Sequence, residues 1–97
     1  MGYKIVSKKE LCPNQYELTI EAPYITRNAK AGQFIILRVN DDSERIPLTI
    51  ADVDKENKLL TIVFMAVGYT TKQLAQLGEN DEICDILKSF DDNLLSK

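Results

Sequence analysis

The sequence predicts a mainly β protein, a six-stranded antiparallel barrel of the Greek-key type that carries one short helix. Apolar and polar residues alternate with a period of two, without a fault over residues 16–21 (YELTIE), as in strands that bury one face. Short polar turns separate such segments, and only residues 70–77 change to the spacing of a helix. Strands of this length with connections this short are typical of small antiparallel barrels.

The expected strands follow one another along almost the whole chain. In order, they cover residues 3–11, 16–21, 33–39, 46–53, 59–67 and 82–87. Pro13 and Asn14 form a turn signal that makes a hairpin of the first two strands. The polar runs at residues 40–43 and 54–57 form further tight turns, and residues 23–31 form a longer connection.

The one expected helix has about two turns. Leu74 and Leu77 share one helical face, as in a helix that packs on a core. Thr70 and Gln73 have the spacing of a capping box, which predicts where the helix begins. Gly78 suits the position just after a helix, which often requires a left-handed backbone.

Size and composition limit the possible functions. The 97 residues make one domain, which we divide into a barrel of residues 1–87 and a tail of residues 88–97. The net charge of −3 argues against a nucleic-acid partner, which needs a basic face. No apolar run reaches the roughly 20 residues that span a membrane, and the first residues lack a signal-peptide pattern, so we expect a cytoplasmic protein.

The reactive side chains leave few options for chemistry. The sequence has no histidine, which excludes Ser-His and Cys-His nucleophiles and argues against a metal site. Cys12 and Cys84 lie far apart without CxxC spacing, so we expect reduced, structural cysteines. Any chemistry is therefore expected from a bound organic cofactor.

Arg45 and Thr49 lie on one face of an expected strand. Positions i and i+4 of a strand are about 13 Å apart, so this cation and this hydroxyl could hold a phosphate and a ring edge of one elongated ligand. Pro47 lies between them and would stiffen that face. The alternative for Arg45 is a surface ion pair with Asp42 or Glu44, which would stabilise the fold little.

Thr70 and Thr71 open the expected helix. A helix N-terminus presents unpaired N–H groups and the positive end of the helix dipole, which suit a phosphate. Gly68 would let the backbone approach such a ligand closely. The alternative is that Thr70 only caps the helix and that Gly68 only makes a turn.

Three motifs occur in the order and with the spacing of a known family: AGQF at 31–34, RIPLT at 45–49 and VGYTT at 67–71. In these motifs, and over about residues 3–87, the chain resembles the FAD-binding domain of ferredoxin–NADP reductase-like proteins. The resemblance is greatest to the branch that contains the dihydroorotate dehydrogenase electron-transfer subunit and the alpha subunit of NADH-dependent ferredoxin:NADP oxidoreductase.

This resemblance implies an electron-transfer oxidoreductase with FAD as its cofactor. It implies the following contacts: Arg45, Gly68, Thr70 and Thr71 with the FAD pyrophosphate, Pro47 and Leu48 with the isoalloxazine ring, and Phe64, Met65 and Ala66 with the adenosine or ribityl side. Thr49 would hydrogen-bond near flavin N5, which makes it the one catalytic residue implied. Plant-type relatives have a stacking aromatic residue where Leu48 stands, so ring stacking is weaker here.

The sequence departs from the family's pattern after the barrel. The family continues with an NAD(P)-binding domain, whereas no GxGxxG loop and no iron–sulfur cysteine cluster occur here. We therefore expect a barrel that holds FAD weakly and does not oxidise NAD(P)H alone, unless a partner subunit supplies the nicotinamide site. The alternative is a non-catalytic interaction or regulatory module that has lost flavin binding. Phe90, Leu94 and Leu95 of the tail could then form an apolar patch that docks on a partner subunit or a second copy, and the alternative for the tail is a frayed terminus.

Overall fold

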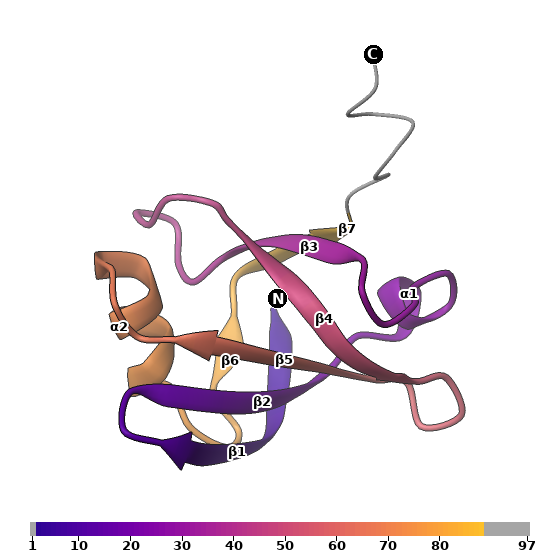
Figure 1. Cartoon of the computed structure of the whole chain (residues 1–97). Helices are drawn as coiled ribbons and strands as arrows, with labels where there is room; N and C mark the ends of the chain where they lie inside the picture. Colours follow the sequence, from indigo (N-terminus) through magenta and orange to yellow (C-terminus); the bar gives the residue numbers. More distant parts are fainter. Residues whose placement is uncertain (1, 89–97) are drawn as a thin grey trace.

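A computed structural model describes residues 2–88 as a nearly closed antiparallel barrel of seven strands (Figure 1). The strands are β1 (Tyr3–Cys12), β2 (Gln15–Glu21), β3 (Phe34–Arg38), β4 (Ile46–Asp54), β5 (Leu59–Met65), β6 (Glu82–Ile83) and β7 (Asp85–Lys88). Two helices, α1 (Pro23–Thr26) and α2 (Tyr69–Gln76), lie at opposite ends of the barrel. The predicted fold class is confirmed, with seven strands in place of six. The tail residues Phe90, Leu94 and Leu95, expected to dock on a partner, lie outside the described residues.

The barrel closes at a bend in the chain between β6 and β7. Around the sheet the strands follow the order β6-β1-β2-β5-β4-β3-β7. β6 pairs with β1 and β7 pairs with β3, so one short segment fastens both edges of the sheet. Cys84 makes the bend, and its backbone N–H donates to the carbonyl oxygen of Val39 at 3.2 Å. The single strand expected over residues 82–87 is therefore two strands, because the bend interrupts it.

The hydrophobic core fills the interior of the barrel from alternating strand positions. Its fully buried aliphatic side chains are Ile5, Leu18, Ile20, Ile35, Leu37, Ile50, Leu60, Ile62, Leu74, Ile83 and Ile86. Leu18 and Ile20 belong to the segment whose alternation predicted a half-buried strand. Each such side chain contributes about 1.5–3 kcal/mol through burial, so the inward faces of the strands carry most of the stability.

The connection expected over residues 23–31 contains a single helical turn, α1. Pro23 occupies the first turn, where its missing N–H has no partner to lose. The Thr26 hydroxyl donates to the Pro23 carbonyl oxygen at 3.2 Å, and Ile25 is buried in the core. The sequence predicted the connection over residues 23–31 but not the helical turn α1 within it.

Helix α2 is anchored by Leu74, which is fully buried. From β1, the Lys8 ammonium donates to the carbonyl oxygen of Ala75 in the last turn, where a cation also suits the helix dipole. The helix ends at Gln76, and its C-cap Leu77 has an extended backbone with φ −75° and ψ 150°. Gly78 follows this C-cap, at the position predicted for it, although without a left-handed backbone, since Gly32 is the one glycine with positive φ in residues 2–88.

Cys12 and Cys84 are both free thiols, as expected. Within residues 2–88, no helix has the length and apolar character needed to cross a membrane.

Gly32 is required by the turn that leads into β3, where its φ is 96°. We expect Gly32→Ala to lower the free energy of unfolding by about 1–2 kcal/mol, because a Cβ is strained in this left-handed region. Urea unfolding followed by far-UV circular dichroism measures the change. Gly78→Ala is the matched control, since neither site has a heavy atom within 4 Å of the added Cβ. An equal loss in both variants would contradict the role of the positive φ.

Candidate functional site

The first predicted motif covers Arg45, the residue just before β4, and the first four residues of that strand. Arg45, Pro47 and Thr49 are exposed, whereas Ile46 and Leu48 are half-buried and pack against the core. This division follows from the pleat of a strand, in which successive side chains point to opposite faces. The spacing therefore predicted the shared face of Arg45, Pro47 and Thr49 correctly. Leu48 lies on the other face.

The N-terminus of α2 is closed by Thr71. Its Oγ1 accepts hydrogen bonds from the backbone N–H groups of Gly68, at 2.9 Å, and Val67, at 3.1 Å, and donates to the Gly68 carbonyl oxygen at 3.1 Å. Thr70 is buried. The alternative in which Thr70 caps the helix is thus wrong, since Thr71 performs that role. Because its hydroxyl is engaged, Thr71 would offer a ligand chiefly its backbone N–H.

A hollow of about 440 Å³ lies between the turn before β4 and the start of α2, and of the first predicted motif Ile46 alone lines it. The β3–β4 connection lines one side with Asp42, Ser43, Glu44 and Ile46, and the start of α2 lines the other with residues 68–71. Its volume lies in the range of small-molecule sites, about 300–1,000 Å³. The first turn of a helix has N–H groups without intrahelical acceptors, which suit an anion. The carboxylates of Asp42 and Glu44 on the other side of the hollow disfavour an anion. An anion would therefore need a cation nearby to bind here.

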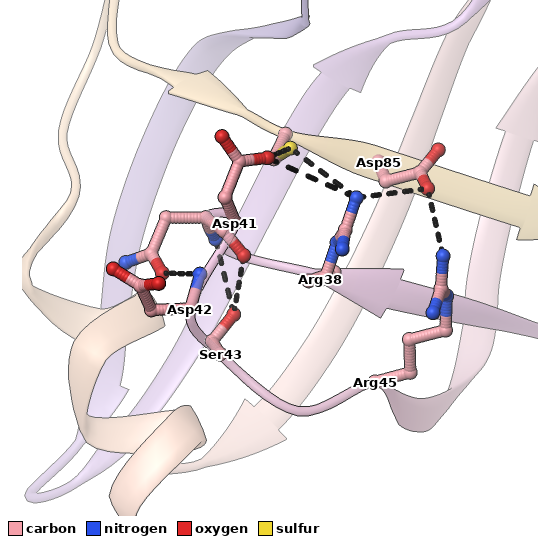
Figure 2. Close-up of polar contacts among 8 residues, drawn as sticks. Arg38, Asp41, Asp42, Ser43, Arg45 and Asp85 are labelled. Atoms are coloured by element: carbon pink, nitrogen blue, oxygen red, sulfur yellow. Dashed lines mark hydrogen bonds and ion pairs between the residues drawn. The ribbon is translucent and has the colours of Figure 1, made fainter.

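Arg45 is the neighbouring cation, but its guanidinium does not line the hollow. Arg45 Nη2 lies 3.4 Å from Asp85 Oδ2 at the start of β7 (Figure 2). The same carboxylate oxygen lies 3.7 Å from Arg38 Nη2. Arg45 therefore forms a surface ion pair, although with Asp85 and not with Asp42 or Glu44. With half of the Arg45 side chain exposed, such a pair stabilises the fold by less than about 1 kcal/mol.

The turn that precedes Arg45 is fixed by its own hydrogen bonds (Figure 2). Ser43 Oγ donates to the Asn40 carbonyl oxygen and accepts from the Asn40 N–H, both at 3.0 Å. The Asp42 N–H donates to Asn40 Oδ1 at 2.9 Å. The backbone on this side of the hollow is consequently preorganised, while the Arg45 side chain is free to change its direction.

The family resemblance implies that Phe64, Met65 and Ala66 contact the adenosine or ribityl side of FAD. Of these three residues, Met65 alone presents its side chain outward. Phe64 and Ala66 are buried, and the Phe64 ring stacks on Tyr16 with 5.8 Å between ring centroids. Met65 is 51% exposed, Val67 72% and Tyr69 77%. These three residues form an exposed apolar strip that leads from the end of β5 to the start of α2.

Gly68 leaves the helix start open to a ligand. Its φ of −114° is accessible to any residue, and an added Cβ would meet nothing closer than Thr71 Oγ1 at 3.7 Å. The fold itself therefore does not require glycine at this position, whereas a close backbone contact with a ligand would. Within residues 2–88, no group of three or more cysteine and carboxylate side chains is arranged to hold a metal ion.

Comparison with known proteins identifies relatives, although no family model matches the chain. It is 54% identical over 85 residues to an uncharacterized protein in the adh 3′ region of Clostridium beijerinckii, covering 88% of this chain and 29% of that protein. It is 36% identical over 84 residues to a dihydroorotate dehydrogenase B (NAD(+)), electron transfer subunit homolog of Thermotoga maritima, covering 87% and 30%. The electron transfer subunit of Lysinibacillus sphaericus is 34% identical over 83 residues, covering 82% and 32%.

A solved structure of the NADH-dependent reduced ferredoxin-NADP oxidoreductase, studied for flavin-based electron bifurcation, matches with a TM-score of 0.85 and 34% identity. The match covers 90% of this chain and 32% of that one, so the chain spans about a third of the length of the proteins it matches. The barrel belongs to the ferredoxin–NADP reductase-like superfamily. Within it, the chain is a homologue of dihydroorotate dehydrogenase electron transfer subunits, which confirms the resemblance found in the three motifs.

The cap on α2 makes a direct prediction about stability. Thr71→Val keeps the shape of the side chain but removes the oxygen that accepts from the Gly68 and Val67 N–H groups. The Val67 N–H keeps its bond to the Met65 carbonyl oxygen at 3.0 Å, so the Gly68 N–H is the group that loses its acceptor. We expect the free energy of unfolding to fall by about 1 kcal/mol, measured by urea unfolding. The control is Thr49→Val on β4, which should stay within about 0.5 kcal/mol because Thr49 is an exposed strand residue. A similar loss in both variants would show that the cap is not responsible.

Proposed function

We propose that the barrel binds FAD across the outer face of β4 and the N-terminus of α2, as the flavin-holding part of an electron-transfer oxidoreductase. The observation that supports this most is the hollow of about 440 Å³ between the β3–β4 connection and the start of α2. It brings the turn just before Arg45, and Ile46 just after it, together with the helix start at residues 68–71, whose backbone N–H groups suit a phosphate. The named relatives, which are electron transfer subunits, support the same class of function.

The pyrophosphate would lie at the start of α2. Thr70 and Thr71 would donate their backbone N–H groups to it, and Gly68 would permit the close approach. Arg45 would turn from Asp85 towards the hollow and offset the negative charge of Asp42 and Glu44. A guanidinium is suited to this task because it binds phosphate through two parallel hydrogen bonds.

The isoalloxazine ring would lie along the outer face of β4. Pro47 would give it a rigid apolar contact, and the Thr49 hydroxyl, exposed on the same face, would hydrogen-bond near N5. Leu48 would contribute its backbone, since its side chain packs against the core. When bound, FAD supplies the hydride and single-electron chemistry, so these residues only have to orient it.

The apolar strip of Met65, Val67 and Tyr69 would lie under the adenosine or ribityl side of the same ligand. Contact with a planar, partly apolar group would remove this exposed surface from water. A nicotinamide site would lie outside the barrel, because the sequence contains no glycine-rich dinucleotide loop. A partner subunit fits this arrangement, since the named relatives are subunits of larger assemblies.

Titration of FAD with the purified protein tests the proposal. We expect saturable quenching of flavin fluorescence and a shifted visible flavin spectrum, because the ring would move from water onto β4. Circular dichroism on the same sample establishes that the barrel is folded. A folded protein that leaves FAD fluorescence unchanged at high concentration would contradict flavin binding and favour an interaction module.

Arg45→Ala separates the phosphate contact from the ring contact. We expect FAD to bind about five- to tenfold more weakly, as for a partly exposed charged hydrogen bond, and riboflavin, which lacks phosphate, to bind unchanged. Fluorescence titrations with both flavins measure the two affinities. Arg27→Ala is the matched control, since Arg27 follows α1 at the other end of the barrel and lies over the Tyr24 ring (Figure 1). Equal losses in both variants would indicate a general charge effect.

A further inference from the structure

Three charged side chains form a row: Arg45 just before β4, Arg38 on β3 and Asp85 on β7 (Figure 2). Leu37 pairs with Ile46 at the last register position between β3 and β4, so the next position places Arg38 beside Arg45. On its other side, Arg38 pairs directly with Asp85 of β7. Two guanidinium groups therefore share one carboxylate, and neither arginine is opposed by a second carboxylate in the row.

The two arginines are held to different degrees. Arg38 is 25% exposed, and besides Asp85 its Nη2 lies 3.9 Å from both Asp41 Oδ1 and Cys84 Sγ. Its Nε is buried and has no hydrogen-bond partner among the described residues. Arg45 is 51% exposed, and over residues 2–88 its guanidinium contacts only Asp85. Arg45 can therefore leave Asp85 by rotating its side chain through solvent, whereas Arg38 is confined.

We propose that Asp85 is an internal competitor for Arg45 that makes this arginine selective for a diphosphate. The inference rests on the proposed function, in which Arg45 binds the pyrophosphate of FAD. Since the guanidinium does not line the hollow, it has to leave Asp85 before it can contact a ligand there. The ligand binds only those protein molecules in which Arg45 has left Asp85. Its apparent affinity is therefore its intrinsic affinity multiplied by the fraction of such molecules.

The competition favours ligands with more than one negative charge. A monoanion offers Arg45 about what Asp85 already provides, so it gains little by displacing the carboxylate. A pyrophosphate carries more charge and also accepts hydrogen bonds from the N–H groups at the start of α2. Only such a ligand gains enough to draw Arg45 away from β7.

Arg38 makes the exchange easier. When Arg45 leaves, Arg38 Nη2 remains 3.7 Å from Asp85 Oδ2, so the carboxylate keeps a cationic partner. An unpaired, half-buried charge would otherwise oppose the release of Arg45. Arg38 is thus a positioning residue, which retains Asp85 on β7 while Arg45 turns to the ligand.

The test compares two single-charge variants in titrations with FAD, riboflavin and inorganic pyrophosphate, the last followed by NMR. Asp85→Asn keeps the size of the side chain and frees Arg45, so FAD and pyrophosphate should bind about two- to fivefold more tightly, as for a surface ion pair removed. Riboflavin should bind as before. Asp41→Asn removes the same charge from a residue that contacts Arg38 but not Arg45, and should give less than half of that gain. Asp85→Glu keeps the charge and should resemble the unmodified protein.

Several outcomes would overturn the inference. Weaker FAD binding by a folded Asp85→Asn protein would mean that Asp85 orients Arg45 for the ligand. Equal gains in Asp85→Asn and Asp41→Asn would mean a general effect of charge. If pyrophosphate binds with the expected pattern but FAD does not bind, the competition stands and the proposed cofactor is wrong. If neither ligand binds to any variant, Arg45 is not part of an anion site and both proposals fail.

Discussion

The bend at Cys84 is the constraint on which both the barrel and its charged surface depend. β6 joins β1 through two residue pairs and β7 joins β3 through four, while Ile83 and Ile86 on either side of the bend are buried. Without this segment, β1 and β3 would be open edges with unpaired backbone groups. The same bend starts β7 at Asp85, directly opposite Arg38. The residues that close the sheet therefore also set the charges beside the candidate site.

The alternation along β4 separates the side chains that stabilise the barrel from those of the candidate site. Ile50 is buried, Ile46 and Leu48 pack against the core, and the intervening side chains face outward. The register shift between Ile50 and Asp52 ends this regular alternation, so the outer face of Arg45, Pro47 and Thr49 is confined to the first part of the strand. Because the two faces share no side chains, the outer one can vary in chemistry while the inner one maintains the barrel.

Local patterns in the sequence predicted most of the fold, and the parts they missed depend on contacts between distant segments. Period-two alternation and turn residues located the strands, since a half-buried strand imposes that pattern by itself. The break at Cys84 escaped prediction because no glycine or proline marks it between Glu82 and Leu87, and the chain bends there to reach two different partner strands. Arg45, Pro47 and Thr49 were found from spacing within one strand. Asp85 and Arg38 were missed, because their meeting with Arg45 depends on the pairing of β7 with β3, which no local pattern encodes.

The position of the candidate site on the outside of the barrel limits how tightly it could hold a ligand by itself. Well-formed small-molecule sites bury about 70–90% of their ligand, whereas a ligand on the outer face of β4 and the apolar strip would be covered from one side. The exposure of Met65, Val67 and Tyr69 is consistent with a surface that is completed by another surface. The proposed competition by Asp85 would suit such a one-sided site, because the ion pair holds Arg45 in a defined place while the ligand is absent. Covering the ligand from its second side would then strengthen binding without any change in the barrel.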